Sequence, residues 1–403
     1  MSSLPAKPVD SLIGKDSQKE RALPTRYLRI RSLLKDLLAR KVIAWYRKKG
    51  RRLPWRMTKN PYRIWVSEVM LQQTRVTSAI PYYQRFLDAF PTLRRLAEAD
   101  LVEVLKQWEG MGYYARARNL HRSAKMVRER YEGSIPDNME ELLSLPGIGR
   151  STAGAILSLA HGRKTPILDA NIQRLLCRLS AVQEDPQKSH TKRLLWDLME
   201  RLLPEKETRL FNQGLMDIGA LFCLPRSPRC RDCPLSSLCQ AFARGVQHRV
   251  PPLKKARPRP VRERGIAIIW WKEGLLIHHR PSIGLLGGLW EFPGVHLDGA
   301  GSAFHLLPRI LERECGLSIH LKAEIFSFLH EYTHFKELIR VFSGDCQQGR
   351  NLFSEAFRWV LPEEIEQLAL SASHRRIARE VSRMEGAQGT PTQMLVFQGG
   401  KQL

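Results

Sequence analysis

No long apolar run occurs in this sequence of 403 residues. None of its apolar stretches approaches the roughly 20 residues that a membrane-spanning helix needs, which excludes a membrane span. A charged and then apolar segment of the secretory type is also missing from the start of the chain. We therefore expect an intracellular protein, cytoplasmic and nucleoid-associated in a bacterium, nuclear or mitochondrial in a eukaryote.

Acidic residues are scarce relative to basic ones. The chain has 40 aspartates and glutamates against 65 lysines and arginines, a formal net charge of +25. Such an excess favours a polyanionic partner such as nucleic acid, although a generally basic protein would show it too. The first 30 residues are polar and irregular, and we expect them to form a disordered basic tail.

Cysteines are few, and four of the seven are crowded together at Cys223, Cys230, Cys233 and Cys239. In a chain that is not secreted, clustered cysteines suggest a metal site rather than disulfides. Four thiolates with this spacing suit zinc or a [4Fe–4S] cluster. The spacing alone favours zinc, because pairs of cysteines separated by two residues are its commonest setting.

The segment Leu145–Ser151 contains two glycines, Gly147 and Gly149, at the junction of two helical patterns. Such a turn lets the backbone approach a ligand closely, and the start of the next helix offers N–H groups to phosphate. Asp169 follows in a polar turn. The alternatives are a purely structural helix connector and an aspartate that only caps a helix.

Residues 65–80 form a strong helical pattern that Pro81 closes or kinks. Glu68, Gln72 and Arg75 would share one face of this helix. If Glu68 is partly desolvated, its pKa rises and it can hold a proton at neutral pH. In water it is an ordinary surface charge.

Trp55 and Arg56 lie side by side in a turn. Their planar groups could stack on a nucleic acid base. The alternative is a tryptophan in the core beside a surface arginine.

Several of these segments match one family. Trp65–Thr74, Gly110–Asn119, Leu145–Ser151 and Leu168–Asn171 occur in the order found in MutY-type adenine DNA glycosylases of the endonuclease III superfamily, which the chain resembles. The resemblance implies that Glu68 is the catalytic acid. It also implies base or DNA contacts for Gln72 and Gln73, and a wedge role for Tyr113 beside a flipped base. Tyr114 could instead be a core residue.

The resemblance further implies that Asp169 is the second catalytic carboxylate and that Asn171 helps to position it. Two positions depart from related enzymes. Ala170 replaces the usual glycine, which would cost about 1 kcal/mol or more if the backbone needed a positive φ. Ser151 stands where bifunctional lyases have a Schiff-base lysine, and a hydroxyl cannot do imine chemistry. The sequence therefore resembles a monofunctional glycosylase that uses water.

The same likeness implies a base-pocket position for Gln213 and identifies the four cysteines with the family's [4Fe–4S] loop. The role of that cluster would be DNA docking or folding.

A proline- and arginine-rich linker is expected over residues 245–264. After it, residues 266–271 and 275–278 read as strands of a hairpin. This region resembles the Nudix-like C-terminal domain of MutY proteins. Only Glu314 survives of the carboxylates in the Nudix metal box, and one carboxylate cannot hold magnesium, so we expect a binder and not a hydrolase.

Tyr332, Thr333 and His334 fall where this family checks for 8-oxoguanine. They keep an aromatic ring, a hydroxyl and an imidazole. The alternative for His334 is an ordinary strand histidine.

The predicted fold is multidomain: an all-α helix-hairpin-helix glycosylase region with an iron–sulfur loop, then an α+β Nudix-like domain. The predicted boundaries are a tail at 1–30, the helical region at 31–244, the linker at 245–264, the Nudix-like domain at 265–372 and a C-terminal tail at 373–403.

The expected substrate is double-stranded DNA with adenine opposite 8-oxoguanine or guanine, and we expect a monomer. The rival functions are a bifunctional endonuclease III-type glycosylase and lyase, a nucleotide pyrophosphohydrolase, and a non-catalytic DNA-binding protein.

Overall fold

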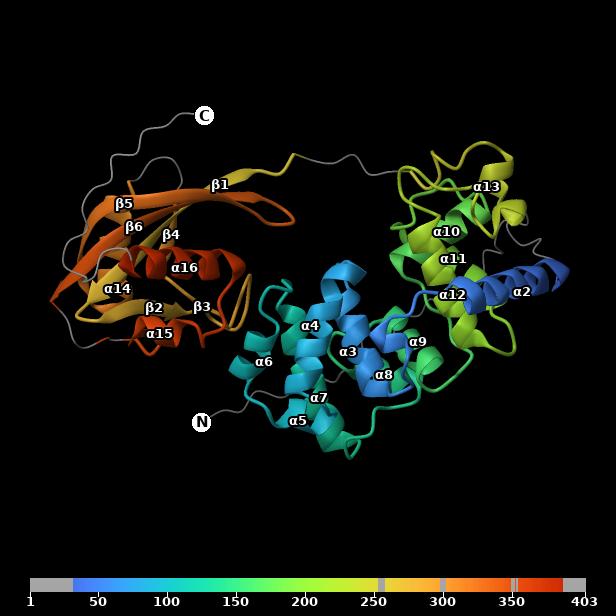
Figure 1. Cartoon of the computed structure of the whole chain (residues 1–403), viewed down its shortest axis with the longest axis horizontal. Helices are drawn as coiled ribbons and strands as arrows, with labels where there is room; N and C mark the ends of the chain where they lie inside the picture. The colour runs from blue at the N-terminus through green and yellow to red at the C-terminus, as the bar shows by residue number, and fades with distance from the viewer. Residues whose placement is uncertain (1–31, 253–257, 298–301, 349–351, 353, 387–403) are drawn as a thin grey trace, which may run out of the picture. The chain divides into compact units, whose positions relative to one another are not determined.

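The computed structural model describes residues 32–252, 258–297, 302–348, 352 and 354–386 (Figure 1). The predicted N-terminal tail lies outside these residues, as does the end of the predicted C-terminal tail. The chain divides into two compact units. Unit 1 combines the residues up to 51 with residues 164–253, and unit 2 combines residues 52–163 with those from 254 onward.

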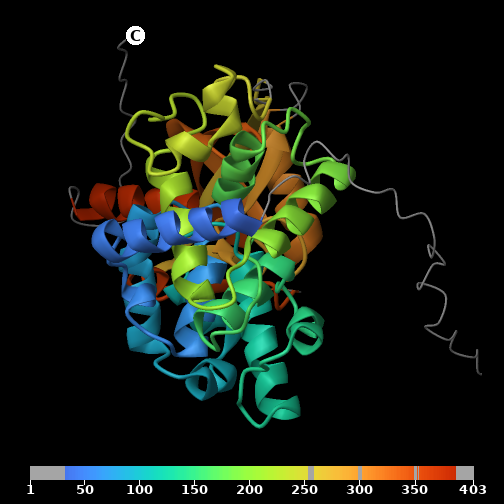
Figure 2. The same ribbon diagram turned by 90° about the vertical axis from the view of Figure 1, so that its right-hand side faces the viewer.

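Unit 1 is helical. Its elements are α2 (Ser32–Lys49), α10 (Ala170–Leu179), α11 (Ser189–Leu202), α12 (Thr208–Leu221), the short 3-10 turn η2 (Ser236–Leu238) and α13 (Gln240–Ala243). Helix α2 packs across α12, and α10 contacts α11, α12 and α13 (Figure 2). Arg51 donates to the buried carboxylate of Asp217 at 2.7 Å and so fixes the end of the α2 segment to α12.

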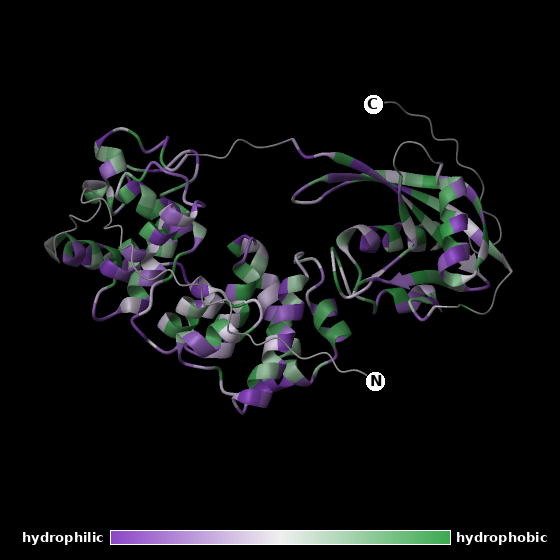
Figure 3. Ribbon diagram, turned by 180° about the vertical axis from the view of Figure 1, so that it is seen from behind, coloured by the Kyte–Doolittle hydropathy of each residue, from purple (hydrophilic) through white to green (hydrophobic). Residues whose placement is uncertain are grey.

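Unit 2 begins with helices whose apolar faces share one core. They are η1 (Pro54–Arg56), α3 (Pro61–Leu71), α4 (Val76–Ala89), α5 (Leu93–Glu98), α6 (Leu101–Gln107), α7 (Ala115–Arg130), α8 (Met139–Ser144) and α9 (Arg150–Leu159). Figure 3 shows apolar and polar residues alternating along the helices, as an amphipathic helix requires.

A mixed seven-stranded sheet forms the C-terminal part of unit 2. Its strands are β1 (Val261–Trp271), β2 (Gly274–His279), β3 (Trp290–Glu291), β4 (Gly294–Leu297), β5 (Ser318–Glu331), β6 (Lys336–Gln348) and β7 (Phe357–Val360). The main order is β3-β2-β1-β6-β5, with β4 paired to β1 and β7 to β2. Strands β1 and β6 run parallel, and the other pairs are antiparallel.

Helices cover both faces of this sheet. Successive side chains of a strand point to opposite faces, so neighbouring residues of β1 pack against different helices. Ile266 and Ile268 of β1 pack toward α15 (Pro362–Ile365) and α16 (Ala372–Gly386). Ala267 and Ile269 pack on the other side, toward α14 (Ala303–Cys315). The sequence predicted the β1–β2 hairpin correctly.

Two predicted boundaries were wrong. Strand β1 begins at Val261, inside the predicted linker. Helix α16 runs to Gly386, well into the predicted C-terminal tail. Its residues Ile377 and Val381 are one helical turn apart and both buried against the sheet, so the sheet needs this helix to complete its core.

No helix in the described residues is both long and apolar enough to cross a membrane.

Candidate active site

Glu68 lies on α3, the helix that forms the centre of the helical core of unit 2. Asn60 caps the start of α3 by accepting a hydrogen bond from the Arg63 N–H at 3.2 Å. Trp65, Val66 and their apolar neighbours on α3 are buried, whereas Glu68 is half-buried. Glu68 therefore sits at the margin of an apolar core.

The predicted single helix over residues 65–80 was wrong. Helix α3 ends at Leu71, Gln72 caps it, and α4 begins at Val76 and continues past Pro81. Gln73 takes a left-handed backbone with φ of 61°, which a continuing α-helix cannot accommodate. Gln72 and Arg75 therefore do not share one helical face with Glu68. The side chain of Gln72 instead donates to Thr152 Oγ1 of α9 at 3.4 Å.

A buried arginine holds this break in place. The Arg116 guanidinium donates to the carbonyl oxygens of Val69, Met70 and Gln72 at 3.0, 2.8 and 2.5 Å. It also donates to Thr74 Oγ1 at 3.3 Å and to the carbonyl oxygens of Met111 and Gly112 at 3.2 and 3.1 Å.

Burial lowers the pKa of Arg116 to about 10, so it remains charged at neutral pH. Arg116 joins the end of the Glu68 helix to the loop that carries Tyr113. Nothing in the sequence around Arg116 indicates this role, because only the folded chain shows where its hydrogen bonds go.

Tyr113 and Tyr114 take opposite environments. Tyr114 is buried, as its alternative reading required, while Tyr113 is 38% exposed and has a positive φ of 50°. A non-glycine residue in this region is strained and persists only where its surroundings hold it. The Tyr113 hydroxyl lies 2.7 Å from Thr333 Oγ1.

Thr333 and His334 occupy the tight turn between β5 and β6, and both are exposed. The turn is closed by the Tyr332 N–H donating to the Phe335 carbonyl at 2.9 Å, with the two rings stacked. His334 is therefore a turn residue and not a strand histidine.

Trp55 does not present its ring for base stacking. It is only 5% exposed and packs edge-on against Tyr83 in the helical core, with ring centroids 5.2 Å apart. The stacking prediction for Trp55 was wrong, because burial of a large aromatic in the core outweighed its position in a turn. Arg56 beside it is half-buried.

The glycine-containing turn connects α8 to α9, as predicted. Gly147 has φ of 80°, and a Cβ there would approach Asn119 Cβ to 2.9 Å, so both backbone and space require glycine. Gly149 caps α9, and a Cβ there would meet no atom within 4 Å. Ser151 follows in the first turn of α9. This turn has the open approach to a helix N-terminus that suits a phosphate.

In unit 1, Asp169 caps α10. Its Oδ1 accepts the Ile172 N–H at 2.7 Å and its Oδ2 accepts the Asn171 side-chain amide at 3.1 Å. Asp169 as a whole residue is half-buried, and burial of its carboxyl group raises its pKa above the usual value. The two hydrogen bonds and the charge of Arg174 act against this rise. Ala170 begins the helix with a helical backbone, so it causes none of the strain considered from the sequence.

Arg174 connects this segment to the cysteine loop. It donates to Asn171 Oδ1 at 2.9 Å, to the Gly219 carbonyl at 2.8 Å and to the Cys223 carbonyl at 2.5 Å. The side chain of Asn171 is thereby held between Arg174 and Asp169.

Gln213 lies on α12 and is 2% exposed. Its Oε1 accepts the Tyr46 hydroxyl at 2.9 Å, and its Nε2 has no hydrogen-bond partner in the described part of the chain. Its contact with a base stays a prediction.

The four clustered cysteines line one cavity. Apolar side chains such as Leu175 and Phe242 complete its wall. All seven cysteines are free thiols. Burial, followed by the charges of neighbouring cysteines, raises the pKa of Cys230, and burial raises that of Cys233 to about 12.

Four soft sulfur donors that line one apolar cavity fit an iron–sulfur cluster, whose ligands must be thiolates. Within the described residues, no group of three or more metal-binding side chains is already arranged around a single point. Arg178 supports the loop by donating to Cys223 Sγ at 3.3 Å and to the Leu224 carbonyl at 2.6 Å.

Comparison with known proteins agrees with this architecture. The family model "HhH-GPD superfamily base excision DNA repair protein" matches residues 66–201, and the model "NUDIX domain" matches residues 265–380. The adenine DNA glycosylase of Rattus norvegicus is 34% identical over 440 residues, which cover 94% of this chain and 85% of the relative.

The chain belongs to the adenine DNA glycosylase family. The human member is 33% identical, covering 84% of this chain and 72% of the relative. The Buchnera aphidicola strain Bp member is 39% identical, covering 62% and 72% respectively. The predicted family and fold class are confirmed, and the protein is a DNA glycosylase enzyme of base excision repair.

Proposed function

We propose that the protein removes adenine opposite 8-oxoguanine or guanine in duplex DNA by hydrolysis, without cutting the strand. The family relationship supports adenine as the substrate. The observation that carries the preference for 8-oxoguanine is the 2.7 Å hydrogen bond between Tyr113 and Thr333. It joins a strained, exposed aromatic residue of the helical part to an exposed hairpin turn of the Nudix-like part, two groups suited to contact an altered base.

Glu68 is proposed as the general acid that protonates N7 of adenine and so makes adenine a better leaving group. The C1′–N9 bond then breaks through an oxocarbenium-like species. The half-buried position of Glu68 at the edge of an apolar core supports this role, because partial desolvation favours the protonated form.

Asp169 is proposed to stabilise the oxocarbenium charge as a carboxylate, with Asn171 holding its orientation. Burial raises the pKa of Asp169, and the hydrogen bonds from Ile172 and Asn171 oppose that rise and so help to keep the ionised form that this role requires. Water completes the hydrolysis. Ser151 in the first turn of α9 provides no amine for a lyase step.

Cys223, Cys230, Cys233 and Cys239 would hold a [4Fe–4S] cluster. With such a cluster bound, these four ligands would tie the 223–239 loop together for DNA docking, and breaking the glycosidic bond would be left to the carboxylates of Glu68 and Asp169. Arg174 and Arg178 anchor this loop to α10.

The test is a duplex with adenine opposite 8-oxoguanine, incubated with the protein and then heated with alkali. We expect a nick at the adenine position only after alkali, and no covalent complex on borohydride trapping. A nick before alkali, or a trapped complex, would instead support the bifunctional lyase. Pyrophosphate release from 8-oxo-dGTP with magnesium would support the pyrophosphohydrolase.

A further inference from the structure

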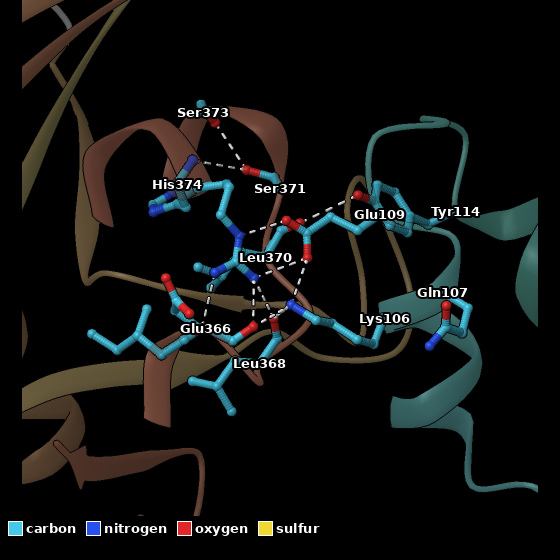
Figure 4. A network of polar contacts seen from close by, with 12 residues as sticks. Lys106, Gln107, Glu109, Tyr114, Glu366, Leu368, Leu370, Ser371, Ser373 and His374 are labelled. Atoms are coloured by element: carbon cyan, nitrogen blue, oxygen red, sulfur yellow. Dashed lines mark hydrogen bonds and ion pairs between the residues drawn. The ribbon is translucent and has the colours of Figure 1, made fainter. Parts of the chain in front are cut away.

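A part-buried ion pair joins the helical and Nudix-like parts of unit 2. Arg375 of α16 donates Nε to Glu109 Oε1 at 2.6 Å and Nη2 to Glu109 Oε2 at 2.9 Å, a bidentate geometry (Figure 4). Only 13% of the arginine side chain and 16% of the glutamate side chain are exposed. Such a desolvated pair is sensitive to the loss of either partner.

Lys106 completes a cluster that we call the clasp, defined as Lys106, Glu109 and Arg375. Lys106 Nζ lies 3.3 Å from Glu109 Oε2 (Figure 4). Lys106 and Arg375 both donate to backbone carbonyls of the segment that leads from α15 to α16, namely those of Ile365, Glu366 and Leu368. Burial alone would raise the pKa of Glu109, but its hydrogen bond with Arg375 and the charge of Lys106 lower it, so the carboxylate stays ionised.

The clasp adjoins the loop that carries Tyr113. Glu109 directly precedes Gly110–Tyr114, where Gly110, Gly112 and Tyr113 all have positive φ. The other end of this loop is also tied to the C-terminal part, because the Tyr114 hydroxyl donates to the Leu370 carbonyl at 3.3 Å. The C-terminal part thus contacts the loop on both sides of Tyr113.

We propose that the clasp positions Tyr113 against the β5–β6 turn, and that Glu109 and Arg375 are thereby positioning residues for discrimination of the base opposite adenine. This inference rests on the proposed function. Contacts that fix Tyr113 and Thr333 relative to each other matter most when the opposite base offers groups that both must reach. Without the clasp, the loop keeps its attachment to Arg116 but loses its alignment with the turn.

The experiment compares Glu109→Gln, Arg375→Gln, the double variant and Arg379→Gln, each in the full-length protein. Arg379 is an exposed arginine one turn further along α16 and serves as the matched control. kcat and KM are measured for adenine opposite 8-oxoguanine and opposite guanine, and amide hydrogen exchange is measured over residues 110–114.

We expect the clasp variants to lose about tenfold in preference for 8-oxoguanine, with the guanine duplex changed less than about twofold. The double variant should lose no more than the worse single variant, because both remove one interaction. Exchange over residues 110–114 should rise in the clasp variants and stay unchanged in Arg379→Gln.

Equal losses on both duplexes, an unchanged preference, or additive losses in the double variant would overturn the proposal. If Arg375→Gln does not fold, the test rests on Glu109→Gln, because glutamine has nearly the same size as the glutamate that it replaces. A wild-type protein that released adenine from neither duplex would refute the proposed function instead. Amide hydrogen exchange over residues 110–114 would then test the proposed role of the clasp, and unchanged exchange in Glu109→Gln would overturn that role.

Discussion

Replacing Arg116 by methionine should both destabilise unit 2 and slow catalysis. Arg116 is 9% exposed, and its guanidinium donates to six acceptors, five of which are backbone carbonyl oxygens. Methionine fills much of the space but donates nothing. Each carbonyl left without a donor costs about 1 kcal/mol, although relaxation and water entry recover part of this. We expect a net loss of about 3–5 kcal/mol.

The assay is urea unfolding followed together with single-turnover adenine release. Arg122→Met is the matched control, because Arg122 is an exposed arginine on the same helix, α7. Arg116→Lys should fall between the wild type and Arg116→Met, since an ammonium group keeps the charge but cannot reach acceptors on both segments. The reasoning is refuted if Arg116→Met unfolds within about 1 kcal/mol of the wild type and keeps its rate.

Three further predictions concern Asn171, Glu291 and Cys233. Asn171→Ala removes a hydrogen bond that lowers the pKa of Asp169. In single-turnover rates measured against pH, activity falls on the acidic side as the Asp169 carboxylate is protonated, and this fall should move to higher pH in the variant. An unchanged pH profile would argue against the contact. Glu291→Gln should destabilise the Nudix-like part by about 3–5 kcal/mol in thermal unfolding, because it leaves Arg264, whose side chain is only 12% exposed, without its carboxylate. The pKa of the Glu291 carboxylate lies far below its usual value. The stability that this carboxylate contributes is therefore present above about pH 4.3 and is lost as the pH falls below that. A Glu291→Gln variant as sensitive to acid as the wild type would contradict this. Cys233→Ser should lower the iron content of purified protein and loosen the 223–239 loop in limited proteolysis, and full iron content would contradict the ligand assignment.

The Glu291 result depends on opposing effects within one cluster. Burial would raise the pKa of Glu291, but the hydrogen bond with His278 and the charges around the carboxylate lower it much more. His374 has its pKa lowered to about 3 by burial, so it is neutral at pH 7. The charge that holds Glu291 ionised at neutral pH therefore comes from Arg264 and Arg280, at 3.3 and 2.8 Å.

Features set by local chemistry could be predicted from the sequence. Gly147 identified the turn between two helices because its backbone conformation excludes other residues. The spacing of the four cysteines indicated that they gather in one place, and they do line one cavity, because residues close in sequence can meet without help from distant segments. Alternating apolar residues identified β1 and β2.

Features set by contacts between distant segments could not be predicted from the sequence. The break at Gln73 depends on Arg116, which lies more than 40 residues later and reaches back to the end of α3. The burial of Trp55 depends on Tyr83. Composition gives no information on either pairing. The apolar spacing of Ile377 and Val381, by contrast, is typical of a helix, and the prediction of a tail over residues 373–403 overlooked this local signal.

The central claim is that a proton on Glu68 makes adenine leave. The most direct test is single-turnover adenine release by Glu68→Gln from a duplex with adenine opposite 8-oxoguanine, with duplex affinity measured in parallel. We predict that base release is abolished while affinity stays close to that of the wild type. Retained release at a rate near that of the wild type would contradict the account.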